Sequence, residues 1–366
     1  MTKLYIKVII LSKGQQMKYL INPNFLCRNL TGIERFAYET CKRLDLLLQP
    51  DDDIGILIPI NAKTIPEFKN IKTINMNNPI KSFPKWDLFE FAFWCKKLNA
   101  TGINFSNTAP LGKACGISFI HDIYAKLYPQ DFSSFKEKLI RFYSCFNYRN
   151  IAKNAKKVIT VSDFSRKQIQ DIYRVSDSRI AVIPNGWDHF QTIKEEPLLQ
   201  DFQLTPSSFY FTLGSLQKRK NLKWIAEYAE KHPAEIFAIS GKAVSGFVSE
   251  DISSLQSLPN VKLLGYVTDS QVKWLMKNCK AFIFPSYYEG FGIPPLEALS
   301  TGTKIIIANA ASLPEIYKDT AVYIDPYNSD CDLNELLQKK CATPTTVLDY
   351  YTYDKASQKL YNILTV

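Results

Sequence analysis

The chain has 366 residues, more than one domain usually contains, so two domains are expected. Hydrophobic residues make up 46% and charged residues 22%, which supports packed cores and excludes a disordered, collagenous or coiled-coil chain. No apolar run approaches the roughly 20 residues that a membrane-spanning helix needs. The formal net charge of +10 is uneven, because residues 1–190 carry +12 and residues 191–366 carry −2.

Residues 1–16 are interpreted as a dispensable leader, because their apolar stretch is too short for a secretory signal and no small-residue cleavage site follows. Met17 directly precedes the first predicted strand, which makes it an alternative start to Met1. The eight cysteines are scattered singly, and with only three histidines the spacing typical of zinc sites is absent. A reducing cytoplasm fits this cysteine usage best.

In the first half, apolar runs predict strands at 18–22, 54–60, 117–120 and 157–161, and helical periodicity predicts helices at 33–48, 133–155 and 163–173. A further strand is expected to end at Ile183-Pro184-Asn185-Gly186. Alternating strands and helices are typical of a parallel sheet covered by helices on both faces. Residues 1–190 are therefore predicted to form one Rossmann-like domain.

The second half repeats this alternation after a stretch with little periodicity at 191–207, which is the predicted linker. Strands are expected at 209–213, 235–239, 261–264, 281–285, 304–308 and 321–324. The α/β fold class predicted is two doubly wound domains, 1–190 and 191–345, followed by a tail, 346–366, that is expected to be helical and to pack on the first domain. Ligands bind such sheets beyond the carboxyl ends of the strands.

The most informative segment runs from Phe284 to Gly302, where a buried strand leads through a turn into a helix. Glu289 lies in the turn and Glu297 lies about one turn inside the helix. Gly290 and Gly292 allow a ligand to approach the backbone, and the helix N-terminus favours an anion such as phosphate. The alternative is a simple turn followed by a solvated glutamate.

This glycine pattern does not match a dinucleotide-binding fingerprint. Pro295 stands where the third glycine would be. The segment therefore argues against a dehydrogenase.

A second segment, Leu213 to Leu222, also joins a strand to a helix. Its consecutive cations could neutralise a diphosphate, Arg219 through forked hydrogen bonds and Lys220 as a point charge. A solvated basic turn is the alternative.

Two weaker signals lie in the first half. His121 follows a predicted strand and could bond a sugar hydroxyl, although a lone histidine is often only a satisfied core or surface group. Gly32 lies in the loop between the first strand and the first helix, where it would permit close backbone approach to a ligand.

Taken in this order, these segments resemble the retaining nucleotide-sugar glycosyltransferases of family 4, in glycosyltransferase group 1. That family has the GT-B fold, in which two Rossmann-like domains face each other across a cleft. The resemblance covers roughly Lys18 to Asn328 and rests chiefly on Glu289 and Glu297 within Glu-Gly-Phe-Gly-x-Pro-x-x-Glu-Ala. Supporting matches are Val158–Ser165, Ile183–Gly186 and Leu313–Glu315.

The resemblance implies that Glu289 contacts the donor sugar and Glu297 the nucleotide ribose. It also implies that Lys220 and an arginine hold the diphosphate, and we assign the arginine role to Arg219 because Ser215 stands where many members carry arginine. The implied catalytic residues are Glu289, His121, Lys220 and Arg219. The implied donor-binding residues are Gly32, Gly214, Arg219, Lys220, Glu289, Gly290, Phe291, Gly292, Ile293 and Glu297.

The first domain would then hold the acceptor and the second the nucleotide sugar. No Asp-x-Asp pair stands out in a cleft loop, so neither a metal nor another cofactor is expected, and the cations with the helix N-termini would stabilise the leaving diphosphate. Two routes to retention stay open: a carboxylate nucleophile, as in retaining glycosidases, and a front-face attack assisted by the leaving phosphate.

The function predicted is transfer of a hexose from a nucleotide-diphosphate sugar to a glycan acceptor, a lipid-linked or cell-surface polysaccharide precursor such as that of lipopolysaccharide. The basic segment with Lys136, Lys138, Lys153 and Lys156 predicts an anionic membrane surface as a partner. The expected location is cytoplasmic and peripheral, on the inner face of the cytoplasmic membrane, with no nucleic-acid partner. The alternatives are a catalytically silent GT-B scaffold or partner subunit, and a nucleic-acid binder with a basic surface.

Overall fold

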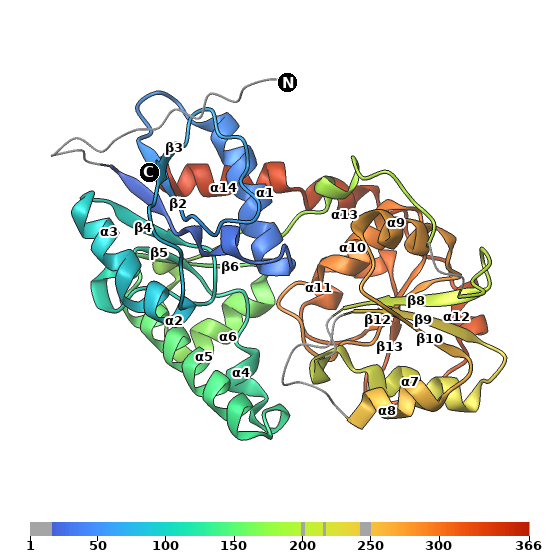
Figure 1. Cartoon of the computed structure of the whole chain (residues 1–366). Coiled ribbons are helices and arrows are strands. Elements are labelled where there is room, and N and C mark those ends of the chain that lie inside the picture. Colours follow the sequence, from blue (N-terminus) through green and yellow to red (C-terminus); the bar gives the residue numbers. More distant parts are fainter. Residues whose placement is uncertain (1–16, 199–201, 215–216, 242–249, 366) are drawn as a thin grey trace. The chain divides into compact units, whose positions relative to one another are not determined.

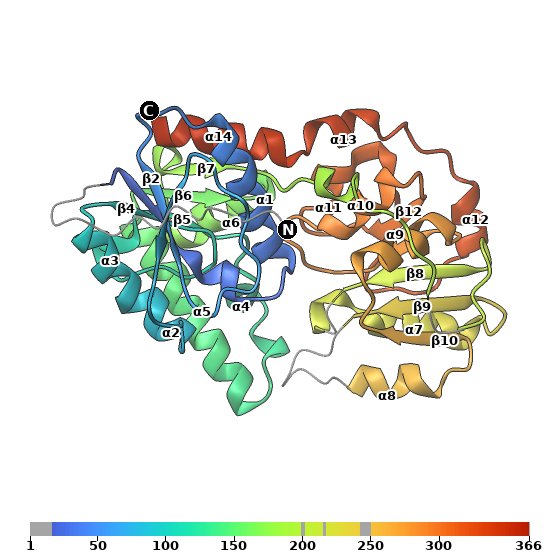
Figure 2. The ribbon, with the colours of Figure 1, turned by 45° about the horizontal axis from the view of Figure 1, so that its top comes forward.

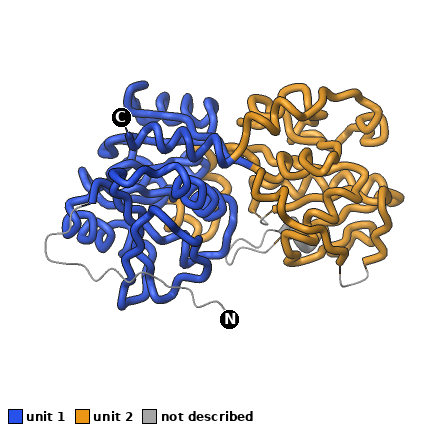
Figure 3. The backbone as a smooth tube through the Cα atoms, turned by 90° about the horizontal axis from the view of Figure 1, so that it is seen from above, with its two compact units in different colours: residues 1–126, 142–186, 353–366 blue, residues 127–141, 187–352 orange. Residues whose placement is uncertain are grey.

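The structure is a computed structural model that describes residues 17–198, 202–214, 217–241 and 250–365. The predicted leader and Ser215 lie outside the described residues. The chain divides into two compact units (Figure 3). Unit 1 comprises Met1–Lys126, Phe142–Gly186 and Tyr353–Val366, and unit 2 comprises Leu127–Arg141 and Trp187–Thr352.

Within the described residues, unit 1 contains a sheet of seven parallel strands in the order β3-β2-β1-β4-β5-β6-β7 (Figure 1). The strands are β1 Tyr19–Ile21, β2 Ile54–Ile58, β3 Lys72–Asn75, β4 Thr101–Asn104, β5 Ile117–Phe119, β6 Lys157–Thr160 and β7 Ile180–Val182. Helices on both faces bury this sheet. They include α1 Gly32–Leu47, α2 Phe83–Lys85, α3 Phe91–Lys97, α6 Asp163–Tyr173 and α14 Tyr353–Thr365.

Successive side chains of each strand point to opposite faces of the sheet, and this alternation divides the core of unit 1 in two. Ile56 packs with Phe36 of α1 and Leu360 of α14, whereas its neighbour Leu57 packs with Trp86 and Phe91. Helix α14 lies beside α1, which places the end of the chain in unit 1 (Figures 1 and 2). Its Ser357 hydroxyl donates to the Thr40 carbonyl at 3.1 Å.

Two helices lie where the chain passes between the units. They are α4 Tyr124–Leu127 and α5 Phe135–Asn154. Residues 127–141 cluster with unit 2, although they were predicted to belong to the first domain.

Within the described residues, unit 2 contains six parallel strands in the order β10-β9-β8-β11-β12-β13. The strands are β8 Phe209–Leu213, β9 Ile236–Ser240, β10 Val261–Gly265, β11 Phe282–Phe284, β12 Ile305–Ala308 and β13 Val322–Ile324. The helices are α7 Leu222–Lys231, α8 Glu250–Ser257, α9 Asp269–Asn278, α10 Ile293–Ser300, α11 Leu313–Tyr317, α12 Leu333–Gln338 and α13 Thr345–Tyr350. Trp224 of α7 packs in the core with Tyr210 of β8 and Ile283 of β11.

Both sheets reverse their direction of winding beside their first strand. β1 lies between β2 and β4, and β8 lies between β9 and β11. The loops that leave the carboxyl ends of such a strand pair diverge to opposite faces of the sheet and leave a crevice for a ligand. The prediction of two doubly wound α/β domains is confirmed.

Some elements and boundaries differ from those expected. Strands β3 and β4 were not predicted, because Lys72–Asn75 and Thr101–Asn104 are short and carry polar residues at both ends. The units divide after Gly186, whereas the expected boundary was 190. Residues 346–366 were expected to form one tail, but α13 belongs to unit 2, where the Leu348 carbonyl accepts from Trp187 Nε1 at 2.9 Å, and only α14 belongs to unit 1.

Candidate active site

Two loops of unit 2 meet at the switch point of its sheet. One follows β8 and carries Arg219 and Lys220, and the other follows the adjacent strand β11 and carries Glu289. The Arg219 carbonyl ties the loops together, because it accepts hydrogen bonds from the Ser286 hydroxyl at 2.8 Å and from the Tyr287 backbone N–H at 3.1 Å.

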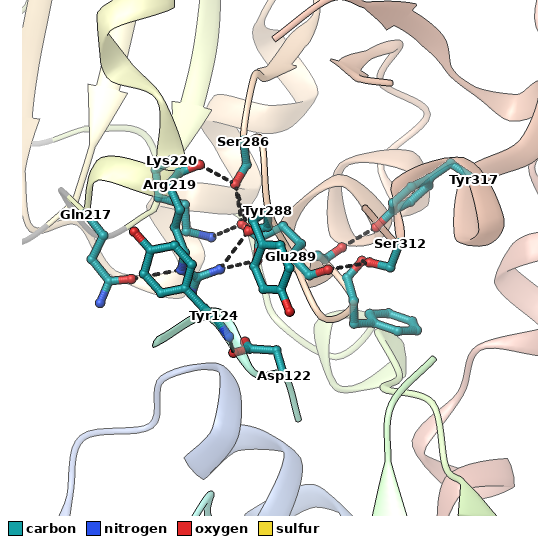
Figure 4. A network of polar contacts seen from close by, with 12 residues as sticks. Asp122, Tyr124, Gln217, Arg219, Lys220, Ser286, Tyr288, Glu289, Ser312 and Tyr317 are labelled. Atoms are coloured by element: carbon teal, nitrogen blue, oxygen red, sulfur yellow. Dashed lines mark hydrogen bonds and ion pairs between the residues drawn. The ribbon is translucent and has the colours of Figure 1, made fainter. Parts of the chain in front are cut away.

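The Glu289 carboxylate is the centre of this cluster, with the surrounding donors pointing toward it (Figure 4). Arg219 Nη1 donates to Glu289 Oε2 at 2.7 Å. Lys220 Nζ and the Ser286 hydroxyl both donate to Oε1, each at 2.7 Å. Glu289 is buried, with only 5% of its surface exposed to solvent.

These partners determine the charge of the site. Burial by itself would raise the pKa of Glu289, but the neighbouring Arg219 and Lys220 charges and the hydrogen bonds to the carboxylate lower it to about 2. Glu289 is therefore ionised at neutral pH and cannot act as a general acid there. One carboxylate beside two cations leaves a net positive charge in the cluster.

Neighbouring groups hold the two cations in place. Arg219 Nε donates to Gln217 Oε1 at 3.0 Å, and Arg219 Nη1 also donates to the Tyr288 carbonyl at 3.2 Å. The Lys220 ammonium lies 4.8 Å from the centre of the Phe284 ring. The lysine stem runs alongside Gly214, where a Cβ would make an ordinary contact of 3.4 Å with Lys220 Cε.

The turn after Glu289 is shaped by hydrogen bonds from α11 and the residue before it. The Ser312 hydroxyl donates to the Glu289 carbonyl at 2.9 Å, and the Tyr317 hydroxyl donates to the Gly292 carbonyl. Gly292 has a φ of +86°, and a Cβ there would lie 2.7 Å from Leu313 Cδ2, so the position requires glycine.

The rest of the predicted donor-binding motif follows this turn. Gly290 is buried, and Ile293 is the first residue of α10. The Phe291 ring packs edge-to-face on Tyr351 with centroids 5.2 Å apart. Phe291 therefore contributes its side chain to the core of unit 2.

Glu297 has a partner that the sequence did not indicate. His189 Nε2 lies 3.2 Å from Glu297 Oε1, and both side chains are largely buried. His189 stands outside every motif recognised in the sequence. Its role depends on a contact between residues more than 100 positions apart, which no local signal predicts.

Residues 127–141 also approach the Glu289 loop within unit 2. The Tyr287 hydroxyl donates to Asp131 Oδ2 at 2.6 Å. The Tyr128 ring lies 5.3 Å from the Tyr287 ring and 5.2 Å from the Tyr288 ring, measured between centroids. This segment therefore supports the residues that immediately precede Glu289.

The remaining predicted site residues belong to unit 1. His121 follows β5, and its Nε2 lies 2.7 Å from the Phe105 carbonyl, while its ring stacks on Phe119. Because a carbonyl only accepts, Nε2 carries the hydrogen and Nδ1 is in the acceptor form. Burial lowers the pKa of His121, which favours the neutral ring. Gly32 is exposed and is the first residue of α1.

In the described part of the chain, no group of three or more His, Cys, Asp or Glu residues is placed to hold a metal ion. Among the same residues, no helix is both long enough and apolar enough to cross a membrane. Metal independence stays a prediction.

Residues 200–347 match the family model described as glycosyl transferases group 1, and residues 30–189 match the model described as glycosyltransferase family 4. The chain is 31% identical over 196 residues to O-antigen chain mannosyltransferase B of Escherichia coli, covering 50% of this chain and 51% of that protein. It is 26% identical over 209 residues to O-antigen chain mannosyltransferase RfbU of Salmonella typhimurium, covering 57% of this chain and 56% of that protein. The matches thus span about half the length of these curated relatives.

A solved structure gives the comparison for the whole fold. The crystal structure of WaaG, a glycosyltransferase involved in lipopolysaccharide biosynthesis, matches with a TM-score of 0.62 over 95% of this chain and 100% of that chain, at 14% identity. At this identity the likeness shows the fold alone. It agrees with the expected GT-B class.

Proposed function

Because the chain belongs to the group 1 glycosyltransferases, we propose that it transfers a hexose from a nucleotide-diphosphate sugar to a glycan acceptor with retention of anomeric configuration. The observation that carries the proposal is the buried cluster of Glu289, Arg219 and Lys220 at the switch point of the unit 2 sheet. That point is where doubly wound sheets bind nucleotides.

The charges of the cluster suit a diphosphate leaving group. Arg219 and Lys220 outnumber the single carboxylate between them, so an additional anion is attracted. Donors fixed in a largely dry site stabilise charge that develops on the leaving phosphate without having to reorganise. Lys220 and Arg219 are therefore assigned to the diphosphate.

The two glutamates are assigned to the sugar and the ribose. Glu289 Oε2 accepts a hydrogen bond from Arg219, and a carboxylate oxygen has capacity for a further donor such as a sugar hydroxyl. Glu297 is assigned to the nucleotide ribose, with His189 holding the carboxylate in position.

The geometry of Glu289 also bears on how configuration is retained. A carboxylate that two cations and a hydroxyl already hold is a weak nucleophile, because its negative charge is stabilised in the ground state. We therefore favour front-face attack, in which the leaving phosphate assists deprotonation of the acceptor, over a covalent intermediate on Glu289.

The relatives support a choice of sugar and acceptor. Two of them are O-antigen chain mannosyltransferases, so mannose is the hexose proposed, and a polysaccharide precursor such as that of lipopolysaccharide is the acceptor proposed. We accordingly propose that the protein works in the cytoplasm, where nucleotide sugars and lipid-linked precursors would meet at the inner face of the membrane.

The test is a panel of nucleotide sugars that includes GDP-mannose and UDP-glucose, scored for thermal stabilisation, hydrolysis and transfer. A bound donor at a hundred times its dissociation constant should stabilise the protein by about 2.7 kcal/mol. Proton NMR of the product gives the anomeric configuration. Binding without any turnover would favour the silent scaffold, and an inverted product would exclude retention.

An anionic membrane surface is the partner we propose for α5. Phe135, Leu139, Phe142 and Phe146 are all exposed and recur at helical spacing along α5. Exposed apolar residues between cations are typical of helices that lie in the membrane interface.

Charge reversal at Lys136, Lys138, Lys153 and Lys156 tests this partner. Each cation near an anionic surface contributes about 1 kcal/mol at most, so the variant should lose most of its binding to anionic liposomes, and salt should weaken the wild type. Donor hydrolysis should be retained. Tighter binding to oligonucleotides than to liposomes would instead support the nucleic-acid alternative.

A further inference from the structure

Unit 1 contains a cavity of about 720 Å³ between α5 and the end of α6. It lies near the amino ends of β6 and β7, because Arg179 directly precedes β7 and Lys153 lies at the end of α5. His121, by contrast, follows the carboxyl end of β5. The cavity is therefore separate from the sheet edge at which the predicted active-site residues of unit 1 lie.

The lining of the cavity is strongly basic. Five cations line it, and no acidic residue does so among the described residues. The cations are Lys126, Arg149, Lys153, Arg174 and Arg179. Like charges gathered around one hollow repel each other, and an anion bound between them would relieve that repulsion.

One of these cations is held rigidly. Arg179 Nη2 donates to the Ala155 carbonyl at 2.7 Å and to the Ala152 carbonyl at 3.1 Å, which caps the end of α5. Arg149 and Arg174 are exposed side chains, one on α5 and one at the end of α6. Their guanidinium groups have the planar fork that matches phosphate oxygens.

A tyrosine adds a neutral donor to the same cavity. The Tyr173 hydroxyl is buried and makes no hydrogen bond among the described residues. Burial raises the pKa of Tyr173 to about 12, so the hydroxyl keeps its proton at neutral pH. A buried donor without a partner is costly unless a ligand accepts from it.

The rim of the cavity is apolar and faces solvent. Phe142 and Phe146 line it, and they are 72% and 42% exposed. A ligand that suits both the basic interior and this rim carries an anionic group next to an apolar portion.

We propose that this cavity binds the phosphate of an anionic phospholipid headgroup, with Phe142 and Phe146 entering the adjacent acyl layer. Arg149, Arg174 and the Tyr173 hydroxyl contact the phosphate oxygens. The proposal rests on the membrane partner proposed above and is independent of transferase activity.

A soluble lipid tests the cavity without a membrane. Dihexanoyl phosphatidylglycerol, held below its micelle concentration, is titrated into the full chain and its dissociation constant is measured by calorimetry. The double variant Arg149→Ala/Arg174→Ala should bind at least tenfold more weakly than the wild type. The matched control Lys136→Ala/Lys138→Ala loses the same charge outside the cavity and should bind like the wild type. Equal weakening in the two variants would overturn the proposal.

Vesicles distinguish the phosphate from mere negative charge. Two sets of phosphatidylcholine vesicles are prepared, one containing phosphatidylglycerol and the other oleate, with the same negative surface charge. The cavity variant should lose affinity only for the phosphatidylglycerol vesicles, and the control should lose affinity equally for both. Equal losses for the cavity variant on both vesicles, or a preference for vesicles with a polyprenyl diphosphate over phosphatidylglycerol vesicles, would exclude a phospholipid headgroup.

The two proposals can fail separately. If the wild type binds dihexanoyl phosphatidylglycerol but neither hydrolyses a nucleotide sugar nor transfers its sugar, only the transferase proposal is contradicted. If the wild type hydrolyses a nucleotide sugar but does not bind the soluble lipid, only the cavity proposal is contradicted.

Discussion

Lys220 Nζ donates a 2.7 Å hydrogen bond to Glu289 Oε1, although the two residues stand 69 positions apart in the chain. Glu289 therefore holds one of the two cations that the proposed mechanism assigns to the donor diphosphate. The same carboxylate also holds the other cation, Arg219. Donor binding and the stability of unit 2 should consequently depend on the same three side chains.

The first prediction concerns acid stability. A carboxyl group with a pKa of about 2 in the folded protein has an ordinary pKa near 4.3 when unfolded, so its ionisation stabilises the fold above roughly pH 4.3. This contribution, on the order of 3 kcal/mol, is lost as the pH falls toward 2. The Glu289→Gln variant should therefore be less stable than the wild type at pH 7. Its transferase activity should also be nearly lost.

Urea unfolding of both proteins between pH 7 and pH 2 checks this. The gap between their free energies of unfolding should narrow as the pH falls through this range. A constant gap would show that the ionised Glu289 adds no net stability. Burial of Glu289 between two cations makes a cost in stability the expected result of this substitution.

The second prediction concerns the donor. Lys220→Ala removes a fixed charge from the diphosphate site and should reduce transfer by about 100-fold and weaken donor affinity. Lys223→Ala is the matched control. Lys223 is exposed on α7 outside the site, and its Nζ lies 3.5 Å from Glu227 Oε1 of the same helix. Initial rates and donor titrations, with circular dichroism to verify folding, give the comparison. Equal effects of the two substitutions would remove Lys220 from the proposed diphosphate site.

The third prediction concerns His189. If its ring holds Glu297 toward the ribose, His189→Ala should weaken nucleoside diphosphate binding by about tenfold, the equivalent of about one hydrogen bond. His189→Gln retains a donor of similar reach and should restore most of the affinity. Calorimetry measures both. Wild-type affinity in the alanine variant would contradict a positioning role for His189. So would a glutamine variant that binds the nucleoside diphosphate as weakly as the alanine variant does.

The fourth prediction concerns the segment that supports the Glu289 loop. The hydrogen bond between Tyr287 and Asp131 should show a coupling of about 1 kcal/mol in a double-mutant cycle. Tyr287→Phe, Asp131→Ala and their combination should therefore destabilise the protein by similar amounts, as measured by urea unfolding. Additive losses would indicate that the two side chains do not interact energetically.

The fifth prediction concerns metal. Because Arg219 and Lys220 are assigned to the charge of the leaving diphosphate, transfer should persist after dialysis against a strong chelator. Assays with and without added magnesium or manganese give the answer. Activity that stops on chelation and returns with one of these ions would contradict the prediction.

The sequence by itself determined the fold class and the loops that carry the site. Apolar runs separated by helical periods located all six described strands of unit 2 within a residue or two, because strands buried on both faces are continuous apolar segments. The spacing from Glu289 through Gly292 to Glu297 identified a strand, turn and helix in that order. Local rules suffice for such features, since each residue is read against its neighbours in the chain.

Only the tertiary structure decided which of these residues meet. The order of strands brings the loop after β8 beside the loop after β11, and this adjacency pairs Lys220 with Glu289. Packing of the chain after β7 brings His189 to Glu297, and residues 127–141 leave the predicted first domain to reach Tyr287. Contacts of this kind join distant segments, so their energies depend on topology and burial, which no window of the sequence contains.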